Sequence, residues 1–90
     1  MIVKVTRRHI NKGLVGDSEA CPIALAVKAV VKRGVKVFVL GDVGIEFTTK
    51  DKSYVRKLPK KALAFIGAFD ACEAVEPIEL NINIPEQLLR

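Results

Sequence analysis

Cys21 and His9 are the two side chains of this sequence that could together perform nucleophilic chemistry. Cys21 directly precedes Pro22, a residue suited to the first position of a helix, so the thiol is expected at the N-cap, where the helix dipole lowers a thiol pKa. A nucleophile also needs a base, and His9 is the only histidine. No third group that would orient the histidine is evident. We therefore favour a cap or core role for Cys21 and a capping or surface role for His9, with a thiol-dependent enzyme as the alternative.

The same residues lack the spacing of a metal site. One histidine and two cysteines, at positions 9, 21 and 72, provide no closely spaced pair of ligands. We expect no metal and no cofactor. Cys21 and Cys72 are expected to be free thiols, since a disulfide between them would require Cα atoms within about 7 Å and an oxidising compartment.

Basic residues are concentrated between positions 50 and 61. The cluster consists of Lys50, Lys52, Arg56, Lys57, Lys60 and Lys61. It spans an expected turn, an edge strand and a helix start, and such a patch could bind the phosphates of a nucleic acid or another anion. No helix-turn-helix, zinc-finger or RNA-recognition pattern accompanies it. The alternative is a solvated edge that prevents strands of different chains from pairing.

The charge of the chain is unevenly distributed. The net charge is +5, but residues 1–61 carry a balance of +9 and residues 62–90 a balance of −4. This asymmetry is typical of an anionic partner, or of complementary charge between two copies of the chain or between two faces of one fold. The apolar end of the chain supplies candidate contacts for a homo-oligomer, namely Ile82, Ile84, Leu88 and Leu89. Their alternative role is to close the core.

The pattern of apolar residues predicts one domain, 1–90, with the element order β-α-α-β-β-β-α-β. The expected ranges are a strand at 2–5, helices at 7–12 and 22–33, strands at 35–40, 45–49 and 54–58, a helix at 59–70 and a strand at 78–84. Because few helices connect the strands, we expect an α+β two-layer sandwich, with a mostly antiparallel sheet and helices packed on one face.

Local signals set the expected ends of these elements. Thr6 is suited to cap the first helix and Gly13 to end it. Gly34 is expected to end the helix that starts at Pro22, and the β-branched strand 35–40 is expected to be central. Gly41 and Gly44 lack the further residues of a phosphate loop, so the segment 41–44 predicts a hairpin turn. The last helix is expected to bury a stripe of Ala62, Phe65, Ile66 and Phe69 and to fray near 71–74.

Three patches of the sequence together resemble a known group of proteins. They are Val5-Thr6-x-x-His9-Ile10-x-x-Gly13, Cys21-Pro22-Ile23-Ala24-Leu25-Ala26, and Leu58-Pro59-x-x-Ala62-x-x-Phe65-Ile66-x-x-Phe69-Asp70-Ala71 followed by Pro77-Ile78-Glu79-Leu80. The pattern is similar to that of small bacteriophage- and prophage-encoded proteins with no assigned function. The resemblance implies a phage-derived origin, which fits a regulator or inhibitor of a host protein, and it carries over no catalytic residue.

These observations lead to one principal expectation. We expect a small, non-catalytic binding or interaction protein that self-associates and can act on a host protein. The sequence has no apolar run of about 18 residues and no signal peptide, so a cytoplasmic protein without a membrane partner is expected. Binding of a nucleic acid or another anion by the 50–61 cluster is the first alternative, and a thiol-dependent enzyme centred on Cys21 is the second.

Overall fold

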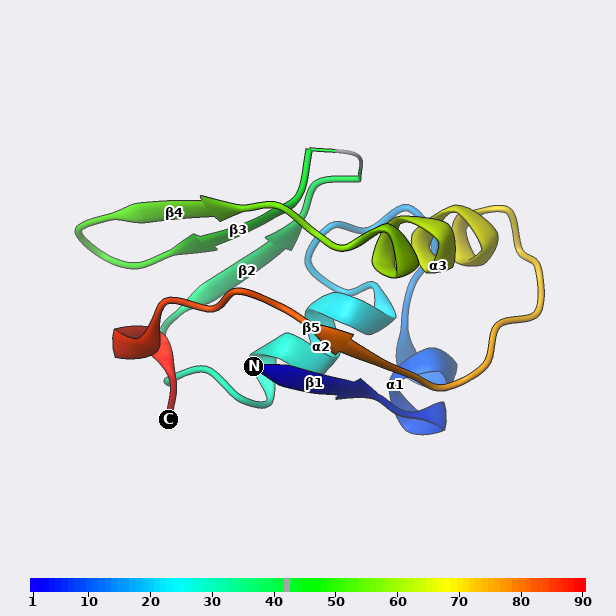
Figure 1. Cartoon of the computed structure of the whole chain (residues 1–90), viewed down its shortest axis with the longest axis horizontal. Coiled ribbons are helices and arrows are strands. Elements are labelled where there is room, and N and C mark those ends of the chain that lie inside the picture. Colours follow the sequence, from blue (N-terminus) through cyan, green and yellow to red (C-terminus); the bar gives the residue numbers. More distant parts are fainter. Residues whose placement is uncertain (42) are drawn as a thin grey trace.

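The computed structural model describes residues 1–41 and 43–90 of the chain. Its elements are β1 (Ile2–Val5), α1 (Arg7–Lys12), α2 (Pro22–Lys28), β2 (Lys36–Val39), β3 (Ile45–Thr48), β4 (Ser53–Arg56), α3 (Lys60–Asp70), β5 (Ile78–Asn81) and a 3-10 turn, η1 (Glu86–Leu88). The predicted order and the α+β class are confirmed (Figure 1). The hairpin turn predicted at 41–44 includes Asp42, which lies outside the described residues.

The strands form two antiparallel sheets. β1 pairs with β5, with Val5 opposite Ile78, and β2, β3 and β4 form a meander with β3 in the middle. Antiparallel pairing is confirmed, but the prediction that the strand at 35–40 is central is wrong, because β2 lies at an edge of its sheet. The connector before α2 covers that edge, since the Val39 N–H donates to the Ser18 carbonyl at 2.8 Å. A covered edge explains why β2 is as apolar as a central strand.

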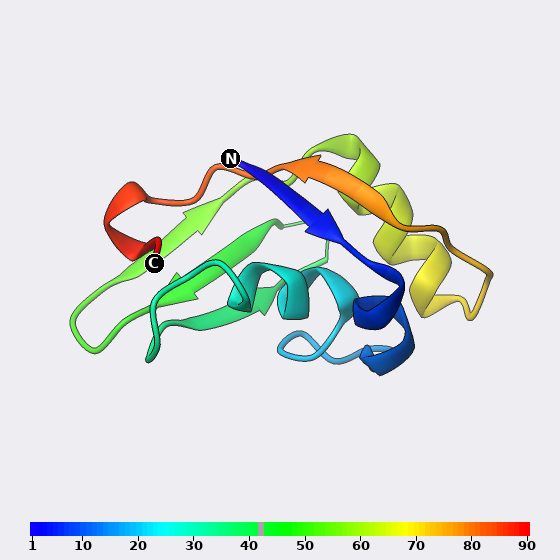
Figure 2. The same cartoon turned by 90° about the horizontal axis from the view of Figure 1, so that it is seen from below.

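α2 packs against both sheets through one shared hydrophobic core (Figure 2). Ile23, Ala24 and Val27 of α2 are fully buried. The β1–β5 sheet contributes Val3, Val5 and Leu80, and the meander contributes Val37, Ile45 and Phe47. Elements from both sheets therefore cover the apolar residues of α2.

α2 ends at Lys28, so the predicted extension to residue 33 is wrong. The Val30 N–H turns back to the Val27 carbonyl at 3.0 Å, and Val31 forms an antiparallel bridge with Leu89. The C-terminal segment thus pairs with backbone groups that a longer helix would need for its own hydrogen bonds. Two adjacent β-branched residues, Val30 and Val31, also favour this extended conformation. Gly34, at φ +92°, turns the chain into β2 instead of ending the helix.

α1 is short and is held by reciprocal hydrogen bonds at its start. The Thr6 hydroxyl accepts the His9 N–H at 3.4 Å, and the Nδ1 atom of His9 accepts the Thr6 N–H at 3.0 Å. This is a capping box in which histidine occupies the position of the usual Glu or Gln. Gly13 ends α1 at an ordinary φ of −67°. A Cβ there would lie 2.6 Å from the ring of Pro22, so glycine is needed for the contact between α1 and α2.

The chain between β4 and α3 lies close to Gly44. This glycine has φ +136°, and a Cβ on it would fall on the carbonyl oxygen of Arg56. Two residues after Arg56, Leu58 is buried in the core, and Pro59 then occupies the N-cap position of α3. The close backbone approach at Gly44 and the buried Leu58 therefore fix the direction in which the chain enters α3.

α3 confirms the predicted stripe and has a more ordered end than expected. Ala62 and Phe65 are buried, and Ile66 and Phe69 are half-buried against the core. Beyond the helix, Cys72 adopts φ +60°. Its N–H donates to the Phe69 carbonyl at 3.0 Å, and the Glu73 N–H donates to the Ala68 carbonyl at 2.9 Å. This pair of bonds is a Schellman motif, so the predicted fraying near 71–74 is replaced by a defined turn.

Candidate functional site

Cys21 occupies the N-cap of α2, as predicted, but its environment opposes ionisation. The side chain is buried, and Sγ accepts the Ala24 N–H at 3.5 Å. Burial raises the pKa of the Cys21 thiol, the hydrogen bonds from Ala24 and Ile23 act against this, and the carboxylates of Asp70 and Asp17 raise it further. The expected lowering by the helix dipole is outweighed, and a protonated thiol at neutral pH suits a cap better than a nucleophile.

His9 is engaged in the cap of α1 and does not meet Cys21 in the described hydrogen bonds. Burial lowers the pKa of His9, and the neighbouring Arg8 lowers it further. A neutral ring is what the cap needs, because Nδ1 must accept the Thr6 N–H. The structure therefore places the two candidate catalytic residues in two separate helix caps.

Cys21 also lines a small cavity of about 210 Å³ between α2, β2 and α3, together with Asp17, Ser18 and Asp70. Both carboxylates are occupied, since Asp70 accepts the Gly16 N–H at 3.2 Å and Asp17 accepts the N–H groups of residues 19 and 20. In the part of the chain that the structure describes, no group of three or more His, Cys, Asp or Glu side chains could hold a metal ion.

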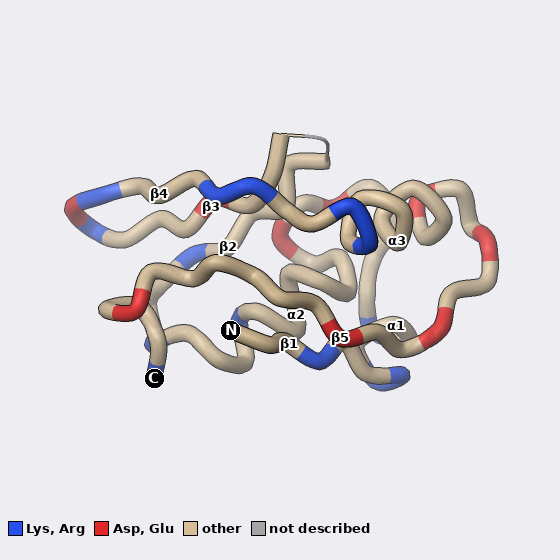
Figure 3. Tube along the Cα trace, viewed as in Figure 1, with Lys and Arg blue, Asp and Glu red and all other residues tan. Residues whose placement is uncertain are grey.

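The predicted basic cluster consists of three short groups that follow one another along the chain, and we call it the basic strip: Lys50, Lys52, Arg56, Lys57, Lys60 and Lys61. The strip follows the β3–β4 turn, the end of β4 and the first turn of α3 (Figure 3). All of its lysines are exposed and Arg56 is half-buried. Asp51, at the tip of the turn, is the one acidic residue between positions 50 and 61. The structure thus spaces the six basic residues along one edge of the molecule.

Contacts within the strip are few and leave its charges uncompensated. Among the described residues the single ion pair joins Arg7 to Glu76, outside the strip. The Arg56 guanidinium lies 5.8 Å from the centroid of the Tyr54 ring, and the Lys61 ammonium donates to the Glu79 carbonyl at 3.3 Å. The first turn of α3 contains no acidic residue and has no side-chain cap. Its two lysines therefore add to the positive end of the helix dipole.

A cavity of about 290 Å³ lies at the turn end of the strip and includes a residue that the sequence analysis missed. It is lined by Gly34, Lys36, Thr48, Thr49 and Lys50. Lys36 is far from the 50–61 cluster in sequence, but the β2–β3 register places it opposite Thr48. The alternation of β2 was the signal that could have revealed Lys36. A residue in a hairpin shares a face with the residue opposite it, so Lys36 had to lie on the same face as its partner in β3.

The candidate oligomer contacts lie mainly in the core of the chain itself. Ile82, Ile84 and Leu88 are buried, and Leu89 is half-buried. The Ile82 N–H donates to the Met1 carbonyl at 2.9 Å, and the Leu88 carbonyl accepts the Lys32 N–H at 2.7 Å. Closure of the core, the alternative that the sequence left open, therefore describes Ile82, Ile84 and Leu88, whose apolar side chains are not displayed to a partner.

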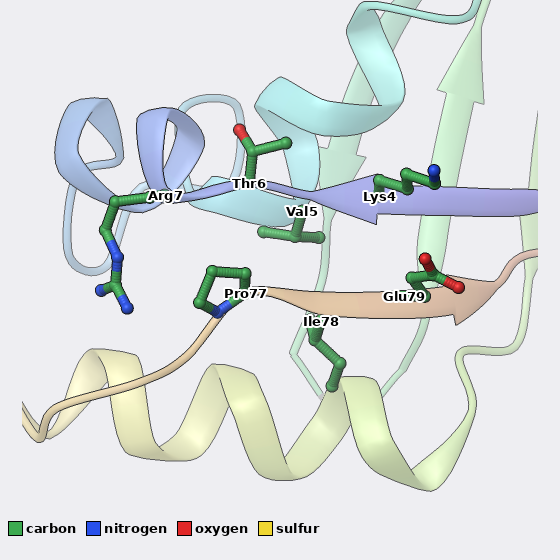
Figure 4. Close-up of a pocket in the computed structure, with 7 residues that line it drawn as sticks. All are labelled: Lys4, Val5, Thr6, Arg7, Pro77, Ile78 and Glu79. Atoms are coloured by element: carbon green, nitrogen blue, oxygen red, sulfur yellow. The ribbon is translucent and has the colours of Figure 1, made fainter.

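An open hollow of about 390 Å³ lies where β1 and β5 separate (Figure 4). Its lining consists of Lys4, Val5, Thr6, Arg7, Pro77, Ile78 and Glu79. At one end, Arg7 pairs with Glu76 at 2.8 Å and donates to the Val75 carbonyl at 3.1 Å. The charged residues of the lining are of both signs, Lys4 and Arg7 on β1 and α1 and Glu79 on β5.

Comparison of the chain with protein-family models, with curated protein sequences and with solved structures gives no match. The phage-derived origin that the sequence resemblance implies therefore stays a prediction. None of the helices in residues 1–41 and 43–90 combines the length and the hydrophobicity needed to cross a membrane.

Proposed function

We propose that this chain is a non-catalytic binding protein whose basic strip binds a polyanion, namely the sugar-phosphate backbone of a nucleic acid. The observation that carries the proposal is the strip itself, in which exposed lysines follow one edge without forming an ion pair among the described residues. A row of uncompensated cations attracts phosphates and releases their counterions, which drives binding at low salt.

The position of Lys60 and Lys61 supports this proposal. Cations in the first turn of a helix are unfavourable, whereas acidic residues there stabilise it. α3 nevertheless begins with two lysines and no acidic residue. A bound phosphate would interact favourably with the lysines and with the free N–H groups of the first turn at once. An arrangement that opposes stability is readily explained when the charges serve a ligand.

The remaining charges and aromatic groups indicate how the ligand is recognised. The acidic residues Glu73 and Glu76 lie on the connection between α3 and β5, away from the strip (Figure 3). Tyr54 is half-buried and lies beside Arg56, so it offers little surface for base stacking. Without a stacking platform, binding is directed at the backbone, and we expect it to be independent of base sequence.

The test is a titration of a fluorescent 20-base-pair duplex at several salt concentrations. If all six cations contact phosphates, the slope of log K against log salt is about −5, and affinity falls roughly 1,000-fold between 50 and 200 mM salt. The double variant Lys57→Glu with Lys60→Glu should weaken binding roughly 100-fold at low salt, because it removes two contacts and adds repulsion.

The matched control is Arg8→Glu with Lys12→Glu. Both control residues are exposed and lie on α1, and the pair changes the net charge by the same amount. A strip-specific site predicts that the control weakens binding much less than the strip variant. Absence of binding at low salt, or equal losses in the two variants, would overturn the proposal.

Self-association is a second candidate, favoured by the outer face of the three-stranded sheet. The register places Phe38, Glu46 and Val55 in one row on this face, with Val55 51% exposed. A second copy, or a host protein if the chain is phage-derived, could cover this row. Light scattering after size exclusion separates the candidates: a dimer that persists in high salt supports an apolar contact, and a monomer at every concentration contradicts it.

A further inference from the structure

The cavity at the turn end of the basic strip has the lining of an anion site. Lys36 and Thr48 are directly opposite in the β2–β3 ladder, and Thr48 is directly opposite Ser53 in the β3–β4 ladder. Residues opposite each other in a sheet share a face, so an ammonium group and two hydroxyls form a row across three strands. Lys50, from the turn that follows Thr48, also lines the cavity.

The hydrogen bonds of this region leave donors available. The Thr48 and Ser53 hydroxyl oxygens lie 3.4 Å apart, so one hydroxyl proton joins them and the other can be donated to a ligand. The ammonium groups of Lys36 and Lys50 form no hydrogen bond or ion pair among the described residues. Each can therefore direct its protons into the cavity.

Thr49 stabilises the turn instead of offering a donor to a ligand. Its hydroxyl accepts the N–H groups of Asp51 at 3.3 Å and Lys52 at 3.0 Å, and it donates to the Lys52 carbonyl at 3.2 Å. With its proton already engaged, Thr49 is a positioning residue that fixes Lys50 at the cavity. Gly34, on the other side, leaves the space open because it has no side chain.

We propose that this cavity binds a phosphate monoester, held by the ammonium groups of Lys36 and Lys50 and by one hydroxyl of the Thr48–Ser53 pair. A monoester carries a charge of about −1.5 to −2 at neutral pH, which two ammonium groups match, whereas a diester within a nucleic-acid chain carries about −1. The nearby Asp51 carboxylate opposes binding, and the lysine charges outnumber it.

The position of the cavity indicates the source of the phosphate. It lies at one end of the basic strip, so a nucleic acid that follows the strip would present its terminal phosphate there. This part of the inference rests on the proposed function. Free inorganic phosphate offers the same charge and the same acceptor oxygens, and the experiment below distinguishes the two sources.

The experiment has two arms and uses the full chain. In the first, inorganic phosphate is titrated while backbone amide shifts are recorded by NMR, and the amides of Lys36, Thr48 and Lys50 should shift together. In the second, affinity is measured for a single-stranded oligonucleotide that carries a 5′-phosphate, a 3′-phosphate or neither. A phosphorylated end should bind about tenfold more tightly than a hydroxyl end, because charged hydrogen bonds are added.

The discriminating variant is Lys36→Gln, because Lys36 lines the cavity but does not belong to the strip. It should weaken phosphate binding about tenfold and remove the preference for a phosphorylated end, while binding of the hydroxyl-ended oligonucleotide is unchanged. Lys12→Gln, which removes one exposed charge on α1, is the control and should retain the preference. Lys50→Gln provides a second variant in a separate segment of the chain.

The outcomes separate the two proposals. If phosphate leaves the three amides unshifted and phosphorylation of the ends makes no difference, the monoester site is overturned, even if the strip binds duplexes with a steep salt dependence. If phosphate binds in the cavity while no oligonucleotide binds, the site stands with a free phosphate as its ligand and the proposed function fails.

Discussion

The two sheets of this protein differ in the ion pairing of the charged residues around them. Beside the β1–β5 sheet, Arg7 forms an ion pair with Glu76, and Lys4 lies opposite the carboxylate residue Glu79 in the register without forming an ion pair among the described residues. Around the three-stranded sheet, the cations of the basic strip and Lys36 lie without an ion-pair partner among the described residues. If the basic strip binds a polyanion as proposed, the compensation of charges rather than their number marks the binding surface, because a cation that is already paired has less to gain from a phosphate.

Among substitutions near the two sheets, Gly44→Ala is expected to have the largest effect on stability and on polyanion binding. The substitution forces a side chain into φ +136° and onto the Arg56 carbonyl, so the strand that carries the strip must move. We expect the free energy of unfolding to fall by about 3 kcal/mol, the sum of strain and overpacking. Urea denaturation measures the loss, and polyanion binding should weaken with it.

Gly16→Ala is the control for Gly44→Ala. Gly16 also has a positive φ, +71°, but a Cβ there meets nothing within 4 Å. Only the conformational strain remains, which predicts a loss of about 1 kcal/mol. Equal losses in the two variants would show that the contact between Gly44 and Arg56 is unimportant.

A smaller effect, with opposite signs in two helices, is expected from Lys60→Glu and Lys12→Glu. Lys60 lies in the first turn of α3 and Lys12 in the last turn of α1. A carboxylate stabilises the first turn and destabilises the last, by roughly 0.3–1 kcal/mol each. Lys60→Glu should therefore raise the free energy of unfolding while it weakens polyanion binding. Lys12→Glu should lower the free energy of unfolding and leave binding nearly intact.

This pair of variants sharpens the contrast between charges that serve the fold and charges that serve a ligand. If Lys60→Glu lowers the thermal midpoint as Lys12→Glu does, the lysines at the start of α3 contribute to the fold, and the argument from the helix dipole is wrong. Circular dichroism melts at low ionic strength provide the measurement, because salt screens the dipole interaction.

The smallest effect is expected from the pH dependence of the α1 cap. The pKa of His9 is lowered in the folded chain, so the unfolded chain binds the proton first. The contribution of His9 to the free energy of unfolding is therefore fully present above pH 6.5, the usual pKa of histidine. It is lost as the pH falls through the lower pKa of the folded state. His9→Gln keeps an acceptor for the Thr6 N–H but does not titrate. The free energy of unfolding of this variant, measured between pH 7 and pH 5, should therefore lack the decrease that the titration of His9 causes. A stability that increases on acidification would contradict the assignment.

Features that depend on neighbouring residues in sequence were predictable. Thr6, Gly13 and Pro59 mark helix ends through their own hydrogen-bonding or steric properties, and each lies where the pattern indicated. The basic strip was also predictable, because all of its members lie within twelve positions of one another.

Features that depend on distant contacts were not predictable. Val30 and Val31 continue the apolar pattern of α2, but the C-terminal segment determines their conformation. Lys36 reaches Lys50 only through the register of a hairpin. The pKa of Cys21 is raised first by burial in the core and only then by Asp70, which lies on another helix, so position at an N-cap alone gave the wrong direction.

The pairing of β1 with β5 has a consequence for the order of folding. The β2–β3–β4 meander joins neighbouring segments, whereas β1 pairs with the last strand of the chain. Because loop-closure entropy grows with the length of the loop, we expect the meander to form first and the β1–β5 ladder last. Pulsed hydrogen exchange should then protect the amides of β3 before those of β1. Until residues 78–84 have left the ribosome, β1 lacks its pairing partner and the core lacks Leu80, Ile82 and Ile84, so the nascent chain is at its most vulnerable to aggregation.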